Sequence, residues 1–402
     1  MNGARPDAGD GPSGRQRLAL LLVGVAAFVS VGALQASFGP SFAALQERYG
    51  VSVAQVGTVV SSYFAGAFVG VLGSGALLIT LGYRRSLVSA ALLVASGALV
   101  IGVAATWLLA LAAAFVAGLG FGQATVAVNL MVARAYGRGA AGALNALNGT
   151  YAVGAVLGPA LVAFATARLG AAAQVSALVF GAVSVGALAF LAGALLLRWL
   201  PVPRRPPRGR GGRPPLAVVS FMAMFFLYVA TEASTPAWIP THLGPRLGTA
   251  NAALVVSGYW AALTLGRFLV MPLAARVRPR DLVLGAAAVT LAGLLLAHLP
   301  GLAVPGYVLA GFGLAPVFPT TIAWLQWRFG DRGEQVTPLV IAAGNLGPVL
   351  GAPLVGVIIA ATSSEVVPSA LAGLGILLLA GVTVTWLSGR RTENASGPPG
   401  GG

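Results

Sequence analysis

The chain has 402 residues and a formal net charge of +15, yet 8% of its residues are charged and 57% are hydrophobic. Soluble globular domains carry about 25% charged residues, and a mean hydropathy of +0.89 excludes that class. The absence of cysteine excludes disulfides, thiol catalysis and thiolate metal sites.

Uncharged stretches of membrane-spanning length follow one another along the chain. Residues 18–46 and 49–83 contain no charged side chain, and the stretches 87–133 and 282–327 are each long enough for two spans. In lipid the backbone polar groups must be satisfied within the segment, so these spans are expected to be helices. We therefore predict an all-α membrane protein with twelve transmembrane helices near residues 18–40, 53–79, 87–105, 108–133, 142–166, 171–197, 216–241, 251–275, 282–298, 303–325, 336–361 and 367–387.

Most of the positive charge falls on one side of this topology. If both termini are cytoplasmic, 20 of the 24 arginines lie in inner loops or tails, and one, Arg267, lies within a span. This bias follows the positive-inside rule. It predicts a multi-pass protein of the cell (inner or plasma) membrane with cytoplasmic N and C termini. The charge then reports topology and contact with anionic membrane lipids rather than a nucleic-acid partner.

A proline- and arginine-rich segment, residues 201–214, divides the chain into halves of similar length. Proline fixes φ and removes helical hydrogen bonds, so we expect an extended cytoplasmic linker. It separates two six-helix bundles, residues 17–200 and residues 215–389. The ends of the chain, residues 1–16 and 390–402, are expected to be disordered cytoplasmic tails.

The two halves resemble each other in sequence. Residues 59–65 (VVSSYFA) match residues 255–261 (VVSGYWA) at an offset of 196, and Gly154 matches Gly347 at an offset of 193. Pseudo-symmetric six-helix repeats of this kind are a known plan of secondary transporters, with the substrate site near the membrane midplane between the halves.

The loop after the second predicted span carries a family resemblance. Its sequence, GALLITLGYRR over residues 75–85, resembles the Gly-x-Leu-x-Asp-Arg-x-Gly-Arg-Arg loop of the major facilitator superfamily. Both glycines, the leucine and the basic pair fit, whereas Ile79 and Thr80 replace the usual acid and first arginine. The resemblance covers residues 17–389 and implies the fold of that superfamily, with a gating role for Arg84 and Arg85.

Several segments resemble one branch of the superfamily, which contains fucose permease and related sugar–proton symporters. These segments are residues 226–240, 263–267, 118–129 and 144–159, corresponding to spans seven, eight, four and five. Symporters of that branch use carboxylates in spans one and four. Here the matching position in span four is Gln123, and span one offers Gln35 and Ser37. The resemblance implies sugar–proton symport, but coupling through those two positions does not carry over.

Glu232 is the candidate for proton coupling, because it is the one carboxylate that falls inside a predicted span. An ionisable group at the bilayer centre costs about 2.5–3.5 kcal/mol on insertion scales, so such residues usually have a function. A titratable group reached alternately from two sides is the minimum that a proton-coupled carrier needs. The alternative is a structural acid that is hydrogen-bonded across the bundle. At the offset of 196, Glu232 aligns with Ala36, and Gln35 lies at a similar height in span one.

Arg267 is expected to be a gating residue. Counted along straight helices, it lies about 12 Å from Glu232 along the membrane normal, which is too far for an ion pair unless the helices tilt or bend. Arg267 would then extend toward the inner loops, and binding of an anionic substrate is its alternative role.

Polar and aromatic side chains of the spans are candidates for substrate binding. Aromatic faces and amides suit sugars, whose hydroxyls bind amides and whose C–H surfaces stack on rings. Helix packing or interfacial anchoring is the alternative for each aromatic, above all for Trp238. The candidates are Gln35, Gln123, Asn129, Tyr151, Tyr228, Trp238, Tyr259, Trp324 and Asn345.

Taken together, these features favour a secondary transporter that works by alternating access as a monomer, coupled to protons and carrying a sugar or similar small polar solute. The main alternative is efflux of a drug-like compound or natural product by proton antiport, and a uniporter results if Glu232 never titrates. A receptor or an intramembrane enzyme is a remote alternative. No zinc-ligand pair, nucleophile elbow or phosphate loop occurs, so we expect neither catalysis nor a cofactor.

Overall fold

The computed structural model describes residues 12–202, 216–274 and 276–395, and every regular element within them is a helix. The first half contains α1 (Gly14–Ser37), α2 (Phe42–Tyr49), α3 (Val53–Val56), α4 (Thr58–Val103), α5 (Trp107–Tyr136), a 3-10 turn (Gly137–Gly139), α6 (Ala140–Arg168) and α7 (Ala172–Leu196). The second half contains α8 (Leu216–Leu247), α9 (Thr249–Leu269), α10 (Met271–Ala274), α11 (Pro279–Leu296), α12 (Ala303–Leu314), α13 (Val317–Phe329), α14 (Asp331–Ala361), a 3-10 turn (Ser364–Val366) and α15 (Val367–Ala395).

Eleven segments of the described residues are long and apolar enough to cross a membrane. One of them, Val53–Val103, contains the second and the third predicted spans. The chain leaves helical geometry there at Gly82, whose φ of 76° and ψ of 172° suit a residue without a Cβ. Both arms of α4 pack against α5, so the segment contributes two of the twelve expected spans.

The two ends of the chain are more helical than we expected. Helix α1 already begins at Gly14, because Ser13 and Gln16 form a capping box in which each side chain bonds the other residue's backbone N–H. Helix α15 continues to Ala395. Residues 1–11 and 396–402 of the two expected tails, and residues 203–214 of the expected linker, lie outside the described residues.

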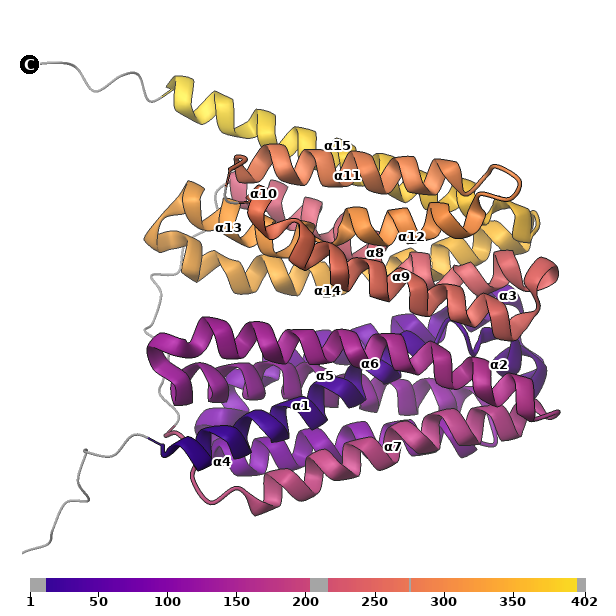
Figure 1. The fold of residues 1–402 in the computed structure, drawn as a ribbon, viewed down its shortest axis with the longest axis horizontal. Helices are drawn as coiled ribbons and strands as arrows, with labels where there is room; N and C mark the ends of the chain where they lie inside the picture. The colour runs from indigo at the N-terminus through magenta and orange to yellow at the C-terminus, as the bar shows by residue number, and fades with distance from the viewer. Residues whose placement is uncertain (1–11, 203–215, 275, 396–402) are drawn as a thin grey trace, which may run out of the picture.

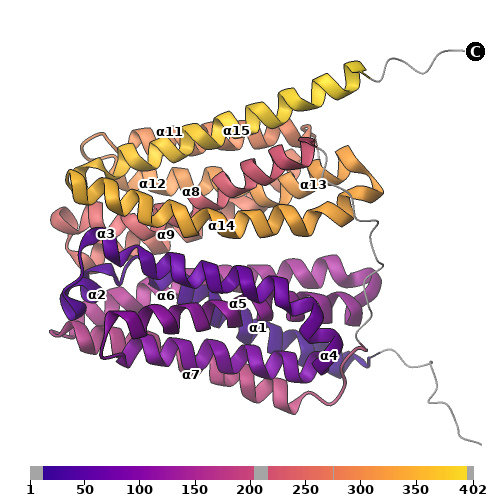
Figure 2. The same ribbon diagram turned by 180° about the vertical axis from the view of Figure 1, so that it is seen from behind.

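The helices form two groups that lie side by side (Figures 1 and 2). Helices α1 and α4–α7 make up the N-terminal group, and α8–α15 make up the C-terminal group. The start of α1 and the end of α15 lie at the same end of the molecule, here called the tail end, and the opposite end is called the far end.

The sequence repeat is also a repeat of helix contacts. A Cβ placed on Gly118 would lie 1.9 Å from the backbone oxygen of Tyr63, and one on Gly311 would lie 2.6 Å from the backbone oxygen of Tyr259. These glycines, and these tyrosines, are equivalent under the sequence offsets. Each half therefore uses a glycine to bring its second and fourth spans into backbone contact, as small residues do in membrane helices.

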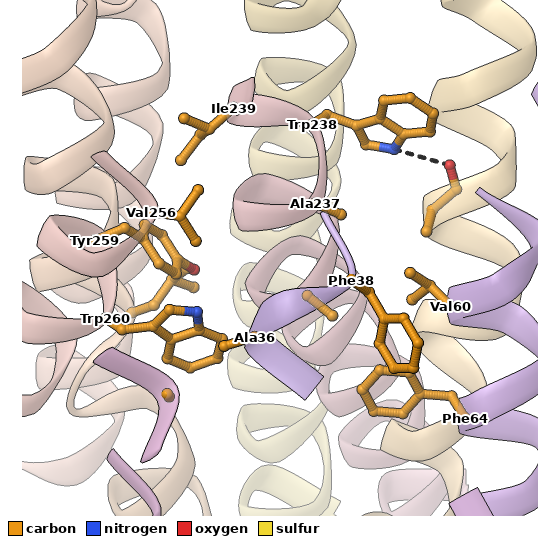
Figure 3. Packing of buried hydrophobic residues seen from close by; sticks show 14 of the residues in the cluster. Ala36, Phe38, Val60, Phe64, Ala237, Trp238, Ile239, Val256, Tyr259 and Trp260 are labelled. Carbon is orange, nitrogen blue, oxygen red and sulfur yellow. Dashed lines mark hydrogen bonds between the residues drawn. The ribbon is translucent and has the colours of Figure 1, made fainter. Parts of the chain in front are cut away.

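The two groups meet tightly toward the far end, where Trp238 of α8 is fully buried (Figure 3). Its ring packs edge-on against Phe42 with 4.9 Å between centroids, and its Nε1 donates a hydrogen bond of 3.0 Å to the Ala352 carbonyl. A Cβ on Gly57 or Gly356 would come within 3.0 Å of the Trp238 ring. Trp238 thus fills a junction between α8, α14 and the N-terminal group.

Two further contacts join the groups in this region. The backbones at Gly39 and Ala237 approach so closely that a Cβ on Gly39 would lie 2.4 Å from the Ala237 Cα. The Ser257 hydroxyl of α9 donates a hydrogen bond of 2.8 Å to the Val156 carbonyl of α6. The far end is closed in this conformation.

Candidate functional site

Glu232 lies in the middle of α8, and two tyrosines hold it. The Tyr228 hydroxyl, one helical turn earlier, donates a hydrogen bond of 2.6 Å to Glu232 Oε1. The Tyr259 hydroxyl of α9 donates one of 3.0 Å to the backbone carbonyl of Glu232. Both tyrosines are fully buried, and the Glu232 side chain is 16% exposed. The carboxylate is therefore oriented by neighbours and still reachable.

Arg267 lies beside this carboxylate, and the expected axial gap of about 12 Å does not separate them. Its Nη2 is 3.9 Å from Glu232 Oε1, within ion-pair range but too long for a hydrogen bond. Our count compared positions on straight helices and left out the reach of a long arginine side chain.

The N-terminal group contributes Tyr151 and Gln35 to the same site. The Tyr151 hydroxyl of α6 donates a hydrogen bond of 2.6 Å to Gln35 Oε1 of α1. Tyr151, Tyr228 and Tyr259 all lie near the charged groups of Glu232 and Arg267. The structure thus brings together six of the predicted residues, two from one half and four from the other.

A small cavity borders this cluster on the side facing the far end. Its volume is about 20 Å³, which holds about one water molecule. Gln35, Ala36 and Gly39 line it from the N-terminal half, and Ala233, Ala237 and Trp260 line it from the C-terminal half. Figure 3 shows the Trp260 ring beside Ala36.

Trp260 is a residue of this site that the sequence analysis missed. Its side chain is 4% exposed, and its buried Nε1 has no hydrogen-bond partner among the described residues. The ring packs edge-on against Tyr151 across the interface, with 6.4 Å between centroids. The available signal was its position in the repeat, where an aromatic residue follows the tyrosine in each half.

Two of the three predicted amides outside Gln35 bind within their own half. Gln123 Nε2 donates to the Ser86 carbonyl at 3.1 Å and to the Ser89 hydroxyl at 2.5 Å. Asn129 Nδ2 donates to the Thr125 carbonyl one turn earlier, at 2.8 Å. Asn345 of α14 is half-buried and makes no side-chain hydrogen bond with the described residues.

The two predicted tryptophans also lie elsewhere. Trp238 closes the far end, as described above, and does not occupy the interfacial position that we considered for it. Trp324 of α13 is buried against Phe221, with 4.9 Å between ring centroids. Both tryptophans therefore pack between helices in this conformation.

The basic pair expected to act in gating, Arg84 and Arg85, lies just after the break of α4 at Gly82, at the tail end of the molecule. The two terminal guanidinium nitrogens of Arg84 donate to backbone carbonyls at the end of α7: Nη1 to Leu195 at 2.6 Å and Nη2 to Leu197. Cations favour a helix C-terminus because its last carbonyls are otherwise unsatisfied. Arg85 is exposed. Arg84 thus ties two helices of the N-terminal group together.

The chemistry available at the site is ionic and acid–base. No group of three or more His, Cys, Asp or Glu side chains among the described residues could hold a metal ion. A carboxylate that can exchange an arginine partner for a proton, at a junction of two helix groups, is suited to coupling a proton to a movement of those groups.

Comparisons with known proteins identify the family. Residues 20–335 match the family model described as Major Facilitator Superfamily. A search of the curated proteins finds no match.

Many solved structures share the fold. A mutant of the nucleoside transporter NupG matches with a TM-score of 0.78 and 13% identity, covering 92% of this chain and 100% of that one. The inward-open xylose transporter XylE from E. coli matches with a TM-score of 0.77 and 14% identity, covering 92% and 96%. A mutant of the E. coli fucose:proton symporter FucP matches with a TM-score of 0.62 and 17% identity, covering 92% and 98%. At these identities the matches show the fold.

Proposed function

Because the chain belongs to the Major Facilitator Superfamily, a family of membrane transporters, we propose that it moves a small polar solute by alternating access and couples this movement to protons through Glu232. A sugar-like solute is the first candidate, since the xylose transporter XylE and the fucose:proton symporter FucP share its fold. The protein is a multi-pass membrane protein and not an enzyme.

The tail end is proposed to face the cytoplasm of a cell whose inner or plasma membrane holds the protein. The arginine bias of the loops supports this orientation. The two bundles, residues 17–200 and 215–389, would then rock about the site while the linker joins them on the cytoplasmic side. In the conformation described, the far end is closed.

One observation carries the proposed coupling: the Glu232 carboxylate lies 3.9 Å from Arg267 while Tyr228 donates to the same oxygen. The carboxylate can remain charged beside the guanidinium, or it can take up a proton and leave the arginine free. The tyrosine bond persists in either state. These two states differ by one proton, and the carboxylate lies where the two halves meet.

The test is the variant Glu232→Gln, reconstituted in vesicles with a proton gradient. Glutamine keeps the size of the side chain and cannot release a proton. Gradient-driven accumulation of the transported solute should fall by at least about tenfold, while exchange of labelled solute across the membrane continues. Glu47→Gln is the matched control, because Glu47 is an exposed acid of α2. Full gradient-driven accumulation by Glu232→Gln would overturn the coupling. If the same gradient drives solute out of vesicles that contain the unmodified protein, the protein is an antiporter.

A further inference from the structure

We propose that the solute of this transporter carries a carboxylate or similar anionic group, and that Arg267 binds this group. The inference rests on the proposed transport function and names the chemistry of its substrate. It starts from the hydrogen-bonding capacity that the site leaves unused.

Arg267 is far from satisfied by the contacts that it makes. A guanidinium offers five N–H donors, and its Nη2 contacts Glu232 at 3.9 Å, beyond hydrogen-bond range. Its Nε is buried and has no partner in the part of the chain that the structure describes. The side chain is nevertheless 33% exposed, so another molecule can reach its remaining nitrogens. Guanidinium forks match carboxylates in bidentate geometry.

Two acceptor atoms around Arg267 already accept a hydrogen bond from a tyrosine. Glu232 Oε1 accepts from Tyr228, and Gln35 Oε1 accepts from Tyr151. Trp260 adds a buried indole N–H, for which no described residue supplies a hydrogen-bond acceptor. It lies seven residues before Arg267, which is two helical turns away on the same face of α9.

The site therefore presents donors that need acceptors. A neutral sugar brings hydroxyls that both donate and accept, and amide side chains would suit it. Of the three amides expected near the substrate in the N-terminal half, Gln123 and Asn129 bind within their own half, and the oxygen of Gln35 is occupied. An anion brings acceptors alone and supplies the charge that Arg267 lacks once Glu232 is protonated.

Charge balance connects this binding to the proton. In the empty site Glu232 is negative and Arg267 is positive, so the pair is neutral. In the loaded site the substrate anion binds Arg267, and Glu232 takes one proton from the adjoining water. The site is neutral again, so neither state places a net charge in the low dielectric of the membrane. One monoanion and one proton cross together, and no net charge moves.

Binding is tested with pairs of probes that differ in the acid group. The pairs are glucuronate and glucose, galacturonate and galactose, lactate and lactamide, and benzoate and benzamide. We expect at least one acid to raise the thermal transition temperature of the purified protein while its neutral partner does not. Equal stabilisation by the neutral partner, or stabilisation by none of the acids, overturns the proposal.

The arginine is tested with three variants and the acid that binds. Arg267→Gln should lower affinity roughly 10- to 100-fold, the range for a lost charged hydrogen bond. Should this variant fail to fold, Glu232→Gln/Arg267→Gln removes both charges and should show the same loss. Arg267→Lys keeps the charge without the fork and should bind with intermediate affinity. Unchanged affinity in the folded variants overturns the role of Arg267.

Transport separates this inference from the coupling proposed above. In vesicles, a pH gradient should drive accumulation of the acid, whereas a potassium diffusion potential alone should not. Accumulation driven by the potential alone would mean that net charge moves, and would overturn the pairing of one anion with one proton. If the acid binds through Arg267 but a pH gradient drives nothing, the coupling by Glu232 fails and the anion site stands.

Discussion

The two halves of the molecule share a scaffold and differ in chemistry. Gly118 and Gly311 make equivalent backbone contacts, one in each half. In contrast, the positions equivalent to Glu232 and Arg267 in the N-terminal half are Ala36 and Val71. The duplicated part of the sequence therefore specifies how helices pack, whereas the charges proposed to bind protons and solute belong to one half alone.

The equivalent tyrosines of the two halves show the same difference between shared packing and separate chemistry, which here concerns the hydroxyl group. Tyr63 and Tyr259 are equivalent in the repeat, and both are fully buried. The Tyr259 hydroxyl donates to the Glu232 carbonyl, whereas the Tyr63 hydroxyl has no hydrogen-bond partner among the described residues. The N-terminal tyrosine keeps its packing role, with Phe38 and Phe121 against its ring. The C-terminal one also positions the functional helix.

The largest expected effect concerns Trp238 and its repeat equivalent, Phe42, which touch each other at the far end. Trp238→Ala removes a buried indole that packs on Phe42 and Gly57 of the N-terminal group. The truncation costs about 3–5 kcal/mol in all, and the part lost in the contacts between the groups weakens closure of the far end. Phe42→Ala removes the smaller ring and should have a smaller effect. The chain has no cysteine, so Ala36→Cys gives a single reactive thiol beside the central cavity.

The measurement is the rate at which a membrane-impermeant maleimide, added at the far side, labels this thiol. In the Trp238→Ala background the rate should rise by at least about tenfold over the rate with Trp238 present, since about 1.4 kcal/mol corresponds to a factor of ten. An unchanged rate would show that Trp238 does not hold the far end closed.

A middle-sized effect is expected from the glycines that build the shared scaffold. Gly118→Ala places a Cβ 1.9 Å from the backbone oxygen of Tyr63, so the two helices must separate, at a cost of about 1–3 kcal/mol or more. Gly311→Ala has a contact of 2.6 Å and should cost less. Gly181→Ala of α7 is the control, because its Cβ meets no described atom within 4 Å. The thermal transition of purified protein ranks the three. A ranking with Gly181→Ala lowest in stability would refute the packing argument.

The smallest effect separates the two tyrosines. Tyr259→Phe loses one buried hydrogen bond, and we expect a loss of about 0.5–1.5 kcal/mol. Tyr63→Phe removes a buried hydroxyl to which no described residue bonds, so its stability should be unchanged or higher. Chemical denaturation of the two variants, compared with the unmodified chain, measures the difference. Equal losses at both positions would mean that the bond to Glu232 adds nothing.

The fold was largely predictable from the sequence, because the signals that specify it are local. Uncharged stretches indicate spans by their length, and the recurrence of residues 59–65 at 255–261 indicates two similar halves. The family model confirms the superfamily that the loop at residues 75–85 suggested. The sequence did not predict that the second and third spans join in one helical segment. We expected a loop between residues 79 and 87, whereas the chain leaves helical geometry at Gly82 alone.

The sequence suggested some members of the cluster around Glu232, but neither all of them nor their geometry. Glu232 was identified by its isolation in a span, and Gln35 by its height in the repeat. The approach of Arg267 depends on the reach of its side chain, which a residue count along straight helices does not contain. Likewise, Gln123 binds Ser86 because α4 and α5 are neighbours in space, and an amide's partner follows from tertiary packing rather than from its own position.

Helix α8 carries both Glu232 and Trp238, six residues apart. A rigid displacement of α8 against the N-terminal group that withdraws the indole from Phe42 also shifts the carboxylate relative to Gln35 and Tyr151. Opening of the far end would therefore move Glu232 together with Trp238, because both residues lie on α8. If Glu232 carries the proton as we propose, this linkage limits slippage, in which protons run down their gradient without a solute. A carrier with these two residues on separate, independently moving helices would have no such safeguard.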